Sequence, residues 1–257
     1  DTTPTLDWNA SSGADYYTMQ VDNDSAFGSV TDTYTGSNTI DTTIALSNGV
    51  TYYWRMKARD AAQNWSSYST ARNFTIDTSA PPVPTHASPA NAYYTNDTTP
   101  YLDWNTSSGA NYYTMQVDNN SNFSSVTDTY NGSGTADTTI TLSNGTTYYW
   151  RMRARDAAGN WSSYSGYRSF TIDTSAPSAP SHSSPANAYY TNDTTPYLVW
   201  NASSGANYYN MQVDNSSGFT SINYTYTGSG TATSTITLSN GTTYYWRMRA
   251  RDAAGNW

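Results

Sequence analysis

The stretch TTYYWRMRARDAAGNWS, residues Thr146–Ser162, decides the fold. It occurs in two further versions, TYYWRMKARDAAQNWS at Thr51–Ser66 and TTYYWRMRARDAAGNW at Thr242–Trp257. Its first half alternates with a period of two, as in a β-strand with two different faces. The face expected to be buried carries Tyr148, Trp150, Met152 and Ala154, and the opposite face carries Tyr149, Arg151, Arg153 and Arg155. The following DAAGN predicts a turn.

The whole chain repeats itself around this stretch. Trp8 recurs as Trp104 and Trp200, which sets a period of about 96 residues, the size of one immunoglobulin-like sandwich. The expected domains are residues 1–76, which lack the first strand, residues 77–173, which are complete, and residues 174–257, which lack the last strand. They are called repeats 1, 2 and 3 below.

Each repeat reads as about seven short strands separated by turns rich in Gly, Asn and Ser, with no helical period. This pattern predicts an all-β protein of tandem antiparallel β-sandwiches. In repeat 2 the expected core consists of Leu102, Trp104, Tyr113, Met115, Val117, Ile140, Leu142, Tyr148, Trp150, Met152, Ala154 and Phe170. Tyr112, Thr114 and Gln116 are expected to face outward.

Composition excludes several classes of protein. The 257 residues contain no Cys, so no disulfide or thiolate metal site can form. All 19 acidic residues are Asp, and the net charge of −8 argues against nucleic acid as a partner. No apolar run approaches the roughly 18 residues of a membrane span. No cofactor is expected.

The residues just quoted resemble fibronectin type III modules, especially the tandem modules of microbial secreted and surface proteins. The resemblance covers the whole chain and is carried by Trp104, by Leu142 shortly before Tyr148, by YYWRMRARDAAGNWS and by the closing SFTIDTSAPSAP. It implies that Tyr148 is the tyrosine-corner residue, with its hydroxyl bonded toward the loop after Leu142. No RGD tripeptide is present. The resemblance therefore implies an architecture rather than a ligand.

The row of cations is the first candidate site. The segment Trp161–Ser165 resembles the WSxWS element of cytokine-receptor modules, in which aromatic rings interleave with Arg. We expect Trp161 and Tyr164 to stack between Arg151, Arg153 and Arg155, and Trp65 and Tyr68 to do so with Arg55, Lys57 and Arg59. This cation–π ladder is read as structural. The alternative is that the stripe binds an acidic ligand or a glycan.

Glycosylation sequons are the second candidate. About 16 Asn-x-Ser/Thr triplets occur, and most fall on expected turns, strand ends or outward positions. They begin at Asn9, Asn23, Asn64, Asn73, Asn96, Asn105, Asn119, Asn122, Asn131, Asn144, Asn160, Asn192, Asn201, Asn215, Asn223 and Asn240. The alternative is that a surface rich in Asn, Ser and Thr produces sequons that are never used.

Metal binding and catalysis have little support in the sequence. The segments Asp22–Ser25 and Val117–Asn120 offer oxygen ligands for Ca²⁺, but Asp is also a turn former, and no metal site is predicted. The two His, His86 and His182, are one position repeated, and no Ser-His-Asp set can be assembled within a repeat. We expect no catalytic residues and no enzyme activity.

The positions within the repeat at which the sequence begins and ends give one further expectation. About 31 further residues would complete three whole repeats, so we expect a window from a longer repetitive polymer; the alternative is a proteolytic or cloning fragment.

Taken together, the sequence predicts a non-enzymatic extracellular or cell-surface structural protein that forms a fibre, stalk or surface layer. Its expected partners are further copies of itself and covalent glycans. The alternative is a carbohydrate-binding or adhesin spacer array attached to a secreted enzyme or surface protein, with outward rings such as Tyr112 and Tyr149 forming a flat strip that stacks on sugars.

Overall fold

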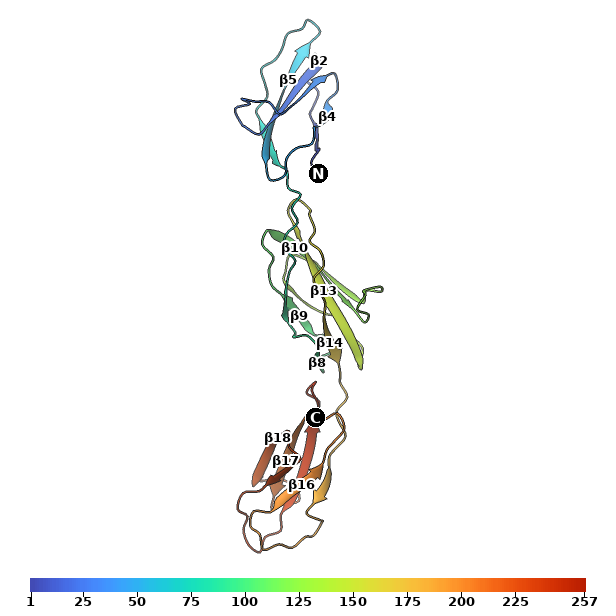
Figure 1. Cartoon of the computed structure of the whole chain (residues 1–257), viewed down its shortest axis with the longest axis vertical. Coiled ribbons are helices and arrows are strands. Elements are labelled where there is room, and N and C mark those ends of the chain that lie inside the picture. Colours follow the sequence, from blue (N-terminus) through green and yellow to red (C-terminus); the bar gives the residue numbers. More distant parts are fainter. The chain divides into compact units, whose positions relative to one another are not determined.

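The computed structural model describes residues 1–257, and every regular element in it is a β-strand (Figure 1). It contains no helix long and apolar enough to cross a membrane. The chain divides into two compact units, which cut across the repeats. One unit comprises Asp1–Val83, Ser107–Tyr112 and Ala154–Ser163, and the other comprises Pro84–Thr106, Tyr113–Arg153 and Tyr164–Trp257. The expected domain boundaries stay a prediction.

Repeat 1 contains two antiparallel sheets. The smaller sheet pairs β1 (Thr5–Asp7) with β4 (Ile40–Thr42). The larger sheet has the strand order β3-β2-β5-β6, with β3 at Asp32–Gly36, β2 at Ala14–Asp22, β5 at Thr51–Asp60 and β6 at Arg72–Thr75. β2 and β5 run side by side in Figure 1, with Met19 opposite Met56.

Repeat 2 has a fuller version of the same plan. Its smaller sheet has the order β12-β9-β7, at Ala136–Thr138, Tyr101–Trp104 and His86–Ser88. Its larger sheet has the order β11-β10-β13-β14-β8, at Asp128–Gly132, Ala110–Asp118, Thr146–Asp156, Arg168–Ile172 and Tyr93–Thr95. β8 is parallel to β14, so the first part of the repeat crosses from one sheet to the other.

Repeat 3 follows the plan without a counterpart of β8 or β14. One sheet has the order β15-β16-β19, at Ser181–Ser184, Tyr197–Asn201 and Ala232–Ser234. The other has the order β18-β17-β20, at Tyr224–Gly228, Tyr208–Asp214 and Tyr245–Arg251. Tyr190, in the segment between β15 and β16, is 95% exposed.

The expected fold class is confirmed in its architecture: the chain is all-β, and its strands form largely antiparallel sheets, as the fibronectin type III resemblance implies. In repeat 2 the alternation along β13 buries one face of the strand completely, with Trp150, Met152 and Ala154 at 0% exposure. Trp104 from the smaller sheet packs against Tyr113 and Tyr130 of the larger one, at centroid distances of 6.2 and 5.5 Å. The apolar side chains of the two sheets thus form one core.

The prediction that Ile140 belongs to the core is wrong. Ile140 is 53% exposed, whereas Thr139 and Leu142 are each 4% exposed. The period of two fails here because β12 ends at Thr138, so the chain after it is not an extended strand. The backbone N–H of Ile140 donates instead to the Asp128 carboxylate (2.9 Å), and its side chain faces solvent.

The prediction that Thr114 faces outward is wrong, because its side chain is buried and only 5% exposed. Its Oγ1 donates a hydrogen bond to Oδ1 of Asn131 on the neighbouring strand β11 (2.8 Å). The Asn131 side chain therefore lies beside Thr114 on the same face of the sheet.

The tyrosine hydroxyls of the strand that follows the SNG turn anchor that turn in all three repeats. The Tyr148 hydroxyl accepts a hydrogen bond from the backbone N–H of Ser143 (3.1 Å), as the resemblance implies for a tyrosine corner. Tyr52 accepts one from Ser47 (3.0 Å) and Tyr244 one from Ser239 (3.2 Å).

Candidate functional site

The cationic face of β13 is covered by the segment that follows the DAAGN turn. Ser162 and Ser165 hold this segment in place, because their backbone N–H groups donate to the carbonyls of Ala154 and Met152 at 2.8 Å each. Their hydroxyls also accept hydrogen bonds from the N–H groups of the same two residues, at 2.9 and 3.2 Å. The two serines therefore fix the position of the aromatic ring between them, Tyr164.

The rings and cations alternate in space. The guanidinium carbon of Arg151 lies 4.1 Å from the centre of the Tyr164 ring, and that of Arg153 lies 4.8 Å from the same ring. The guanidinium carbon of Arg155 lies 5.2 Å from Trp161. These distances fall within the range in which a cation is attracted to the face of a ring.

Repeat 1 has the same arrangement with a lysine in the middle. Arg55 lies 4.0 Å from the Tyr68 ring and Arg59 lies 5.4 Å from Trp65. The ammonium nitrogen of Lys57 lies 4.5 Å from Trp65 and 5.1 Å from Tyr68. In repeat 3, Arg249 and Arg251 lie 4.3 and 5.5 Å from Trp257.

Three further side chains per repeat extend the ladder, and sequence reasoning missed them. A Phe covers the free face of the first Arg, with Phe123 4.0 Å from Arg151. A Tyr covers the last Arg, with Tyr112 4.6 Å from Arg155. Gln116 binds the edge of Arg151. The equivalents are Phe27, Tyr16 and Gln20 in repeat 1 and Phe219, Tyr208 and Gln212 in repeat 3.

A signal for these residues exists in the sequence, since each recurs at the same place in every repeat. The Phe was hard to place because it sits at the tip of a loop in the left-handed backbone region, with φ of 56°, 56° and 52° for Phe27, Phe123 and Phe219. A strand or helix period cannot predict the direction of a side chain in that conformation.

The Asp residues considered for Ca²⁺ organise this Phe loop. Asp118 is fully buried, and its two carboxylate oxygens accept hydrogen bonds from the backbone N–H groups of Asn120 (3.3 Å) and Ser125 (3.1 Å). Asp22 does the same with Asp24 and Ser29. No group of three or more His, Cys, Asp or Glu in the structure is placed to hold a metal ion. The turn-forming role of Asp therefore accounts for these segments.

The cations of the ladder are half-buried in repeats 1 and 2, whereas Arg247 and Arg249 of repeat 3 are exposed. The Nε atoms of Arg59, Arg155 and Arg251 are buried without a hydrogen-bond partner, because the neighbouring rings exclude water from them. Tyr112 packs edge-on against Trp161 and Tyr149 packs edge-on against Tyr167, at centroid distances of 6.1 and 5.2 Å. Neither Tyr presents its ring as part of a flat strip.

The sequons fall into two groups. In five of them the amide nitrogen that would carry a glycan already donates a hydrogen bond: Asn64, Asn105, Asn144, Asn160 and Asn201. The second group is exposed and consists of Asn9, Asn23, Asn73, Asn96, Asn119, Asn122, Asn131, Asn192, Asn215, Asn223 and Asn240. Four of the first five, Asn64, Asn105, Asn144 and Asn201, are exposed as well. Asn160 is the least accessible, because it is half-buried and donates to both Asp77 and Asp156.

His86 belongs to the sandwich rather than to a reaction centre. Its Nε2 donates to the backbone carbonyl of Trp150 (3.2 Å), and its ring packs edge-on against the Trp150 ring at 4.4 Å. Burial lowers the pKa of His86, more than the hydrogen bond to Trp150 raises it. The fold therefore favours the neutral imidazole.

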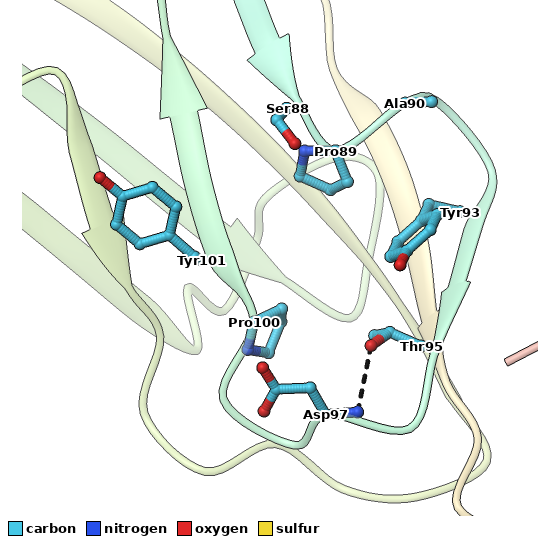
Figure 2. A pocket seen from close by; sticks show the side chains of 8 residues that line it. All are labelled: Ser88, Pro89, Ala90, Tyr93, Thr95, Asp97, Pro100 and Tyr101. Carbon is cyan, nitrogen blue, oxygen red and sulfur yellow. Dashed lines mark hydrogen bonds between the residues drawn. The ribbon is translucent and has the colours of Figure 1, made fainter. Parts of the chain in front are cut away.

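A pocket of about 340 Å³ lies where the first part of repeat 2 crosses between the sheets. Figure 2 shows the Tyr93 ring on one side of it and the rings of Pro89 and Pro100 on the other, with the Asp97 carboxylate near Pro100. One oxygen of that carboxylate accepts hydrogen bonds from N and Oγ1 of Thr99. The ring of Tyr101 projects away from the others and is 60% exposed.

Comparison with known proteins gives two similarities. The chain is 30% identical over 287 aligned positions to Exoglucanase B of Cellulomonas fimi; the alignment covers 99% of this chain but 23% of that protein. A crystal structure of the FN1–FN3 domains of chicken CNTN1 matches 99% of this chain and 90% of its own, with a TM-score of 0.47 and 15% identity. No family model matches the chain.

Proposed function

We propose that this chain is a non-enzymatic structural array of fibronectin type III-like repeats, located outside the cell, which forms a fibre, a stalk or a surface layer from further copies of the same repeat. One observation carries the proposal. The side chains that could bind a ligand or react are the Arg row and the neighbouring aromatic rings. In all three repeats they contact one another within the same repeat. Such a repeat contributes length and stability rather than a reaction.

The coat of the array would be hydrophilic and glycosylated at some of the exposed sequons. The supporting observation is that fifteen of the 16 candidate Asn residues are exposed, eleven of them outside the group whose amide already donates a hydrogen bond. Intact-mass measurement of the protein from its source, followed by glycopeptide mapping, tests both parts. We expect mass above 28.2 kDa from sugar and from additional repeats. An unmodified mass for the chain, together with isolated short particles in electron micrographs, would refute the array and its glycan coat.

The second candidate function is a carbohydrate-binding or adhesin spacer array attached to a secreted enzyme or surface protein. The similarity to part of an exoglucanase favours it, as do the exposed rings of Tyr93 and Tyr101 near an available carboxylate. The test is co-sedimentation with insoluble glucan, using Tyr93→Ala and Tyr101→Ala as variants. Binding that both variants abolish would favour this function over the inert array, and absence of binding would remove it.

A further inference from the structure

The peptide group that joins Asp77 to Thr78 lies at the junction between repeats 1 and 2, and side-chain amides from both repeats bind it. Its N–H donates to Oδ1 of Asn48 in repeat 1 (2.8 Å). Its carbonyl accepts a hydrogen bond from Nδ2 of Asn160 in repeat 2 (3.0 Å). The N–H and C=O of a trans peptide group point in opposite directions. Repeat 1 therefore holds this group from one side and repeat 2 holds it from the other.

Both side-chain amides are themselves fixed. Nδ2 of Asn48 donates to the hydroxyl of Ser79 (2.8 Å). In the DAAGN turn, N and Nδ2 of Asn160 donate to the two carboxylate oxygens of Asp156, at 2.8 and 3.0 Å. The hydrogen bonds thus form one continuous chain, from the carboxylate in repeat 2 through the peptide group to Asn48 in repeat 1. Bonds in such a chain polarise one another, so each strengthens its neighbours.

The junction between repeats 2 and 3 has the same chain of hydrogen bonds. The N–H of Thr174 donates to Oδ1 of Asn144 (2.8 Å), and the carbonyl of Asp173 accepts a hydrogen bond from Nδ2 of Asn256 (2.6 Å). Nδ2 of Asn256 also donates to Oδ2 of Asp252 (2.9 Å). Both junctions of the chain are therefore held in the same way.

A second contact binds each junction five residues further along the chain. The hydroxyl of Ser107 donates to the carbonyl of Pro82, and that of Ser203 donates to the carbonyl of Ser178. These bonds, like those to Asp77 and Asp173, reach backbone atoms. The repeat that follows a junction thus holds its backbone at two places.

The compact units of the chain reflect these contacts. The segments Ser107–Tyr112 and Ala154–Ser163 of repeat 2 fall in the same unit as Asp1–Val83, which comprises repeat 1 and the junction. Ser107 and Asp156, which lie in these two segments, are each 7% exposed. The two segments therefore form the surface of repeat 2 that contacts the junction.

We propose that the Asp77–Thr78 peptide group, bound by the side-chain amides of Asn48 and Asn160, is a clamp that couples the stability of each repeat to that of the next. Opening the chain on either side frees the peptide group and so costs the hydrogen bond on the other side as well. The coupling is reciprocal. It goes beyond the proposed array, because it acts within a single chain.

Native-state amide hydrogen exchange of the full chain, followed by NMR, tests the clamp. The probes in repeat 1 and its junction are the N–H groups of Gly49, which donates to the carbonyl of Ile76 (2.8 Å), and of Thr78. We expect Asn160→Ala, a change in repeat 2, to accelerate the exchange of both amides about two- to tenfold, the effect of losing one hydrogen bond. A residue that only shaped its own turn would not move them.

Asn256→Ala is the matched control, because it removes the equivalent amide from the junction between repeats 2 and 3. It should leave the exchange of Gly49 and Thr78 unchanged. It should accelerate the exchange of Gly145 and Thr174, which occupy the same places in repeat 2 and in its own junction.

Reciprocity gives a test from the other side of the junction. Asn48→Ala, a change in repeat 1, should accelerate the exchange of the backbone N–H of Asn160 by a similar factor, although the acceptor of that N–H, Asp156, is untouched. Ser107→Ala removes the contact with Pro82 and leaves the DAAGN turn unchanged. It should accelerate the exchange of Thr78 even if Asn160→Ala does not fold.

Three outcomes would overturn the proposal. These are changes after Asn160→Ala and Ser107→Ala that are confined to repeat 2, equal acceleration of Gly49 and Thr78 by Asn256→Ala, and no response of Asn160 to Asn48→Ala. The proposed array is judged separately, by mass and microscopy of the native material. Unchanged exchange together with long native particles would therefore refute the clamp alone.

Discussion

Gln116 accepts two hydrogen bonds from Arg151, one from Nε at 3.1 Å and one from Nη2 at 2.9 Å, while the face of the same guanidinium lies 4.1 Å from the centre of the Tyr164 ring. The planar cation is thus bound at its edge by an amide and at its face by a ring. A neutral partner avoids the cost of desolvating a carboxylate beside the rings. This geometry needs a flat, forked cation, which Lys cannot provide.

Lys57 stands in repeat 1 at the position that Arg153 holds in repeat 2, one step along the same ladder, and it allows a matched test. We expect Lys57→Arg to raise the free energy of unfolding of repeat 1 by about 0.5–1 kcal/mol, because a guanidinium can stack on Trp65 and Tyr68 with its whole plane. Urea unfolding monitored by tryptophan fluorescence measures the change. The reverse substitution, Arg153→Lys, is the control and should destabilise repeat 2 by a similar amount. Equal stability in both variants would mean that the stacking contributes nothing.

The tyrosine corner should contribute measurable stability. Tyr148→Phe removes the acceptor for the backbone N–H of Ser143 and should lower the free energy of unfolding by about 1–2 kcal/mol. Thermal unfolding by circular dichroism gives the comparison. Tyr94→Phe, at a side chain that is 46% exposed, should leave the unfolding temperature where it was. A variant of Tyr148 that is as stable as the parent would show that water replaces the lost acceptor.

Leu142 and Ile140 test whether burial follows the alternation predicted from the sequence or the positions found in the structure. Leu142→Ala should cost about 2–5 kcal/mol, since the side chain is 4% exposed and its removal leaves a cavity. Ile140→Ala should cost less than about 0.5 kcal/mol, because Ile140 is 53% exposed. Denaturant midpoints of the two variants decide the matter. A large loss at Ile140 would restore the alternation that the sequence predicts.

Acid should weaken the DAAGN turn. Burial raises the pKa of the Asp156 carboxyl, but the hydrogen bonds from the side chain and backbone of Asn160 outweigh burial, and the pKa lies below its ordinary value. A lowered folded-state pKa contributes stability that is present above the unfolded value of about 3.9 and lost as the pH falls through the folded pKa. We therefore expect the free energy of unfolding of repeat 2 to drop below about pH 4.

The control is Asp156→Asn, which cannot titrate. Its unfolding free energy should be lower than that of the parent at pH 7 and should change less between pH 5 and pH 2. Asp60 and Asp252 contribute to the same acid dependence of the parent, since hydrogen bonds from Asn64 and Asn256 lower their pKa values as well. A variant with the same pH slope as the parent would assign the acid sensitivity to other carboxyls.

Local alternation predicted much of the fold. The two faces of β13, the buried Trp104 and the two-sheet plan all follow from a period of two and from turn residues, which are properties of neighbouring residues. The prediction failed where the backbone leaves the strand conformation. After Thr138 the chain is no longer extended, so Ile140 turns outward and Leu142 inward by a spacing that no regular period describes.

The candidate site was predicted in part. The sequence places Arg151, Trp161 and Tyr164 close enough along the chain to be recognised as one ladder. Gln116, which binds Arg151 from 35 residues away, has no local signature, and neither does the left-handed loop that presents Phe123. Placing these residues requires the sheet register and the loop hydrogen bonds of Asp118.

By itself, the sequence determined that this protein is all-β and built from near-identical repeats, whose strands have an apolar inner face and a cationic outer face, because periodicity and repetition can be recognised from the order of residues along the chain. Only the tertiary structure decided which hydrogen-bond partners the polar side chains have. Asn160 binds the backbone carbonyl of Asp77, a residue 83 positions away along the chain, and Arg151 binds Gln116 from 35 positions away. Hydrogen-bond partners are set by proximity in space, and no local pattern records that proximity.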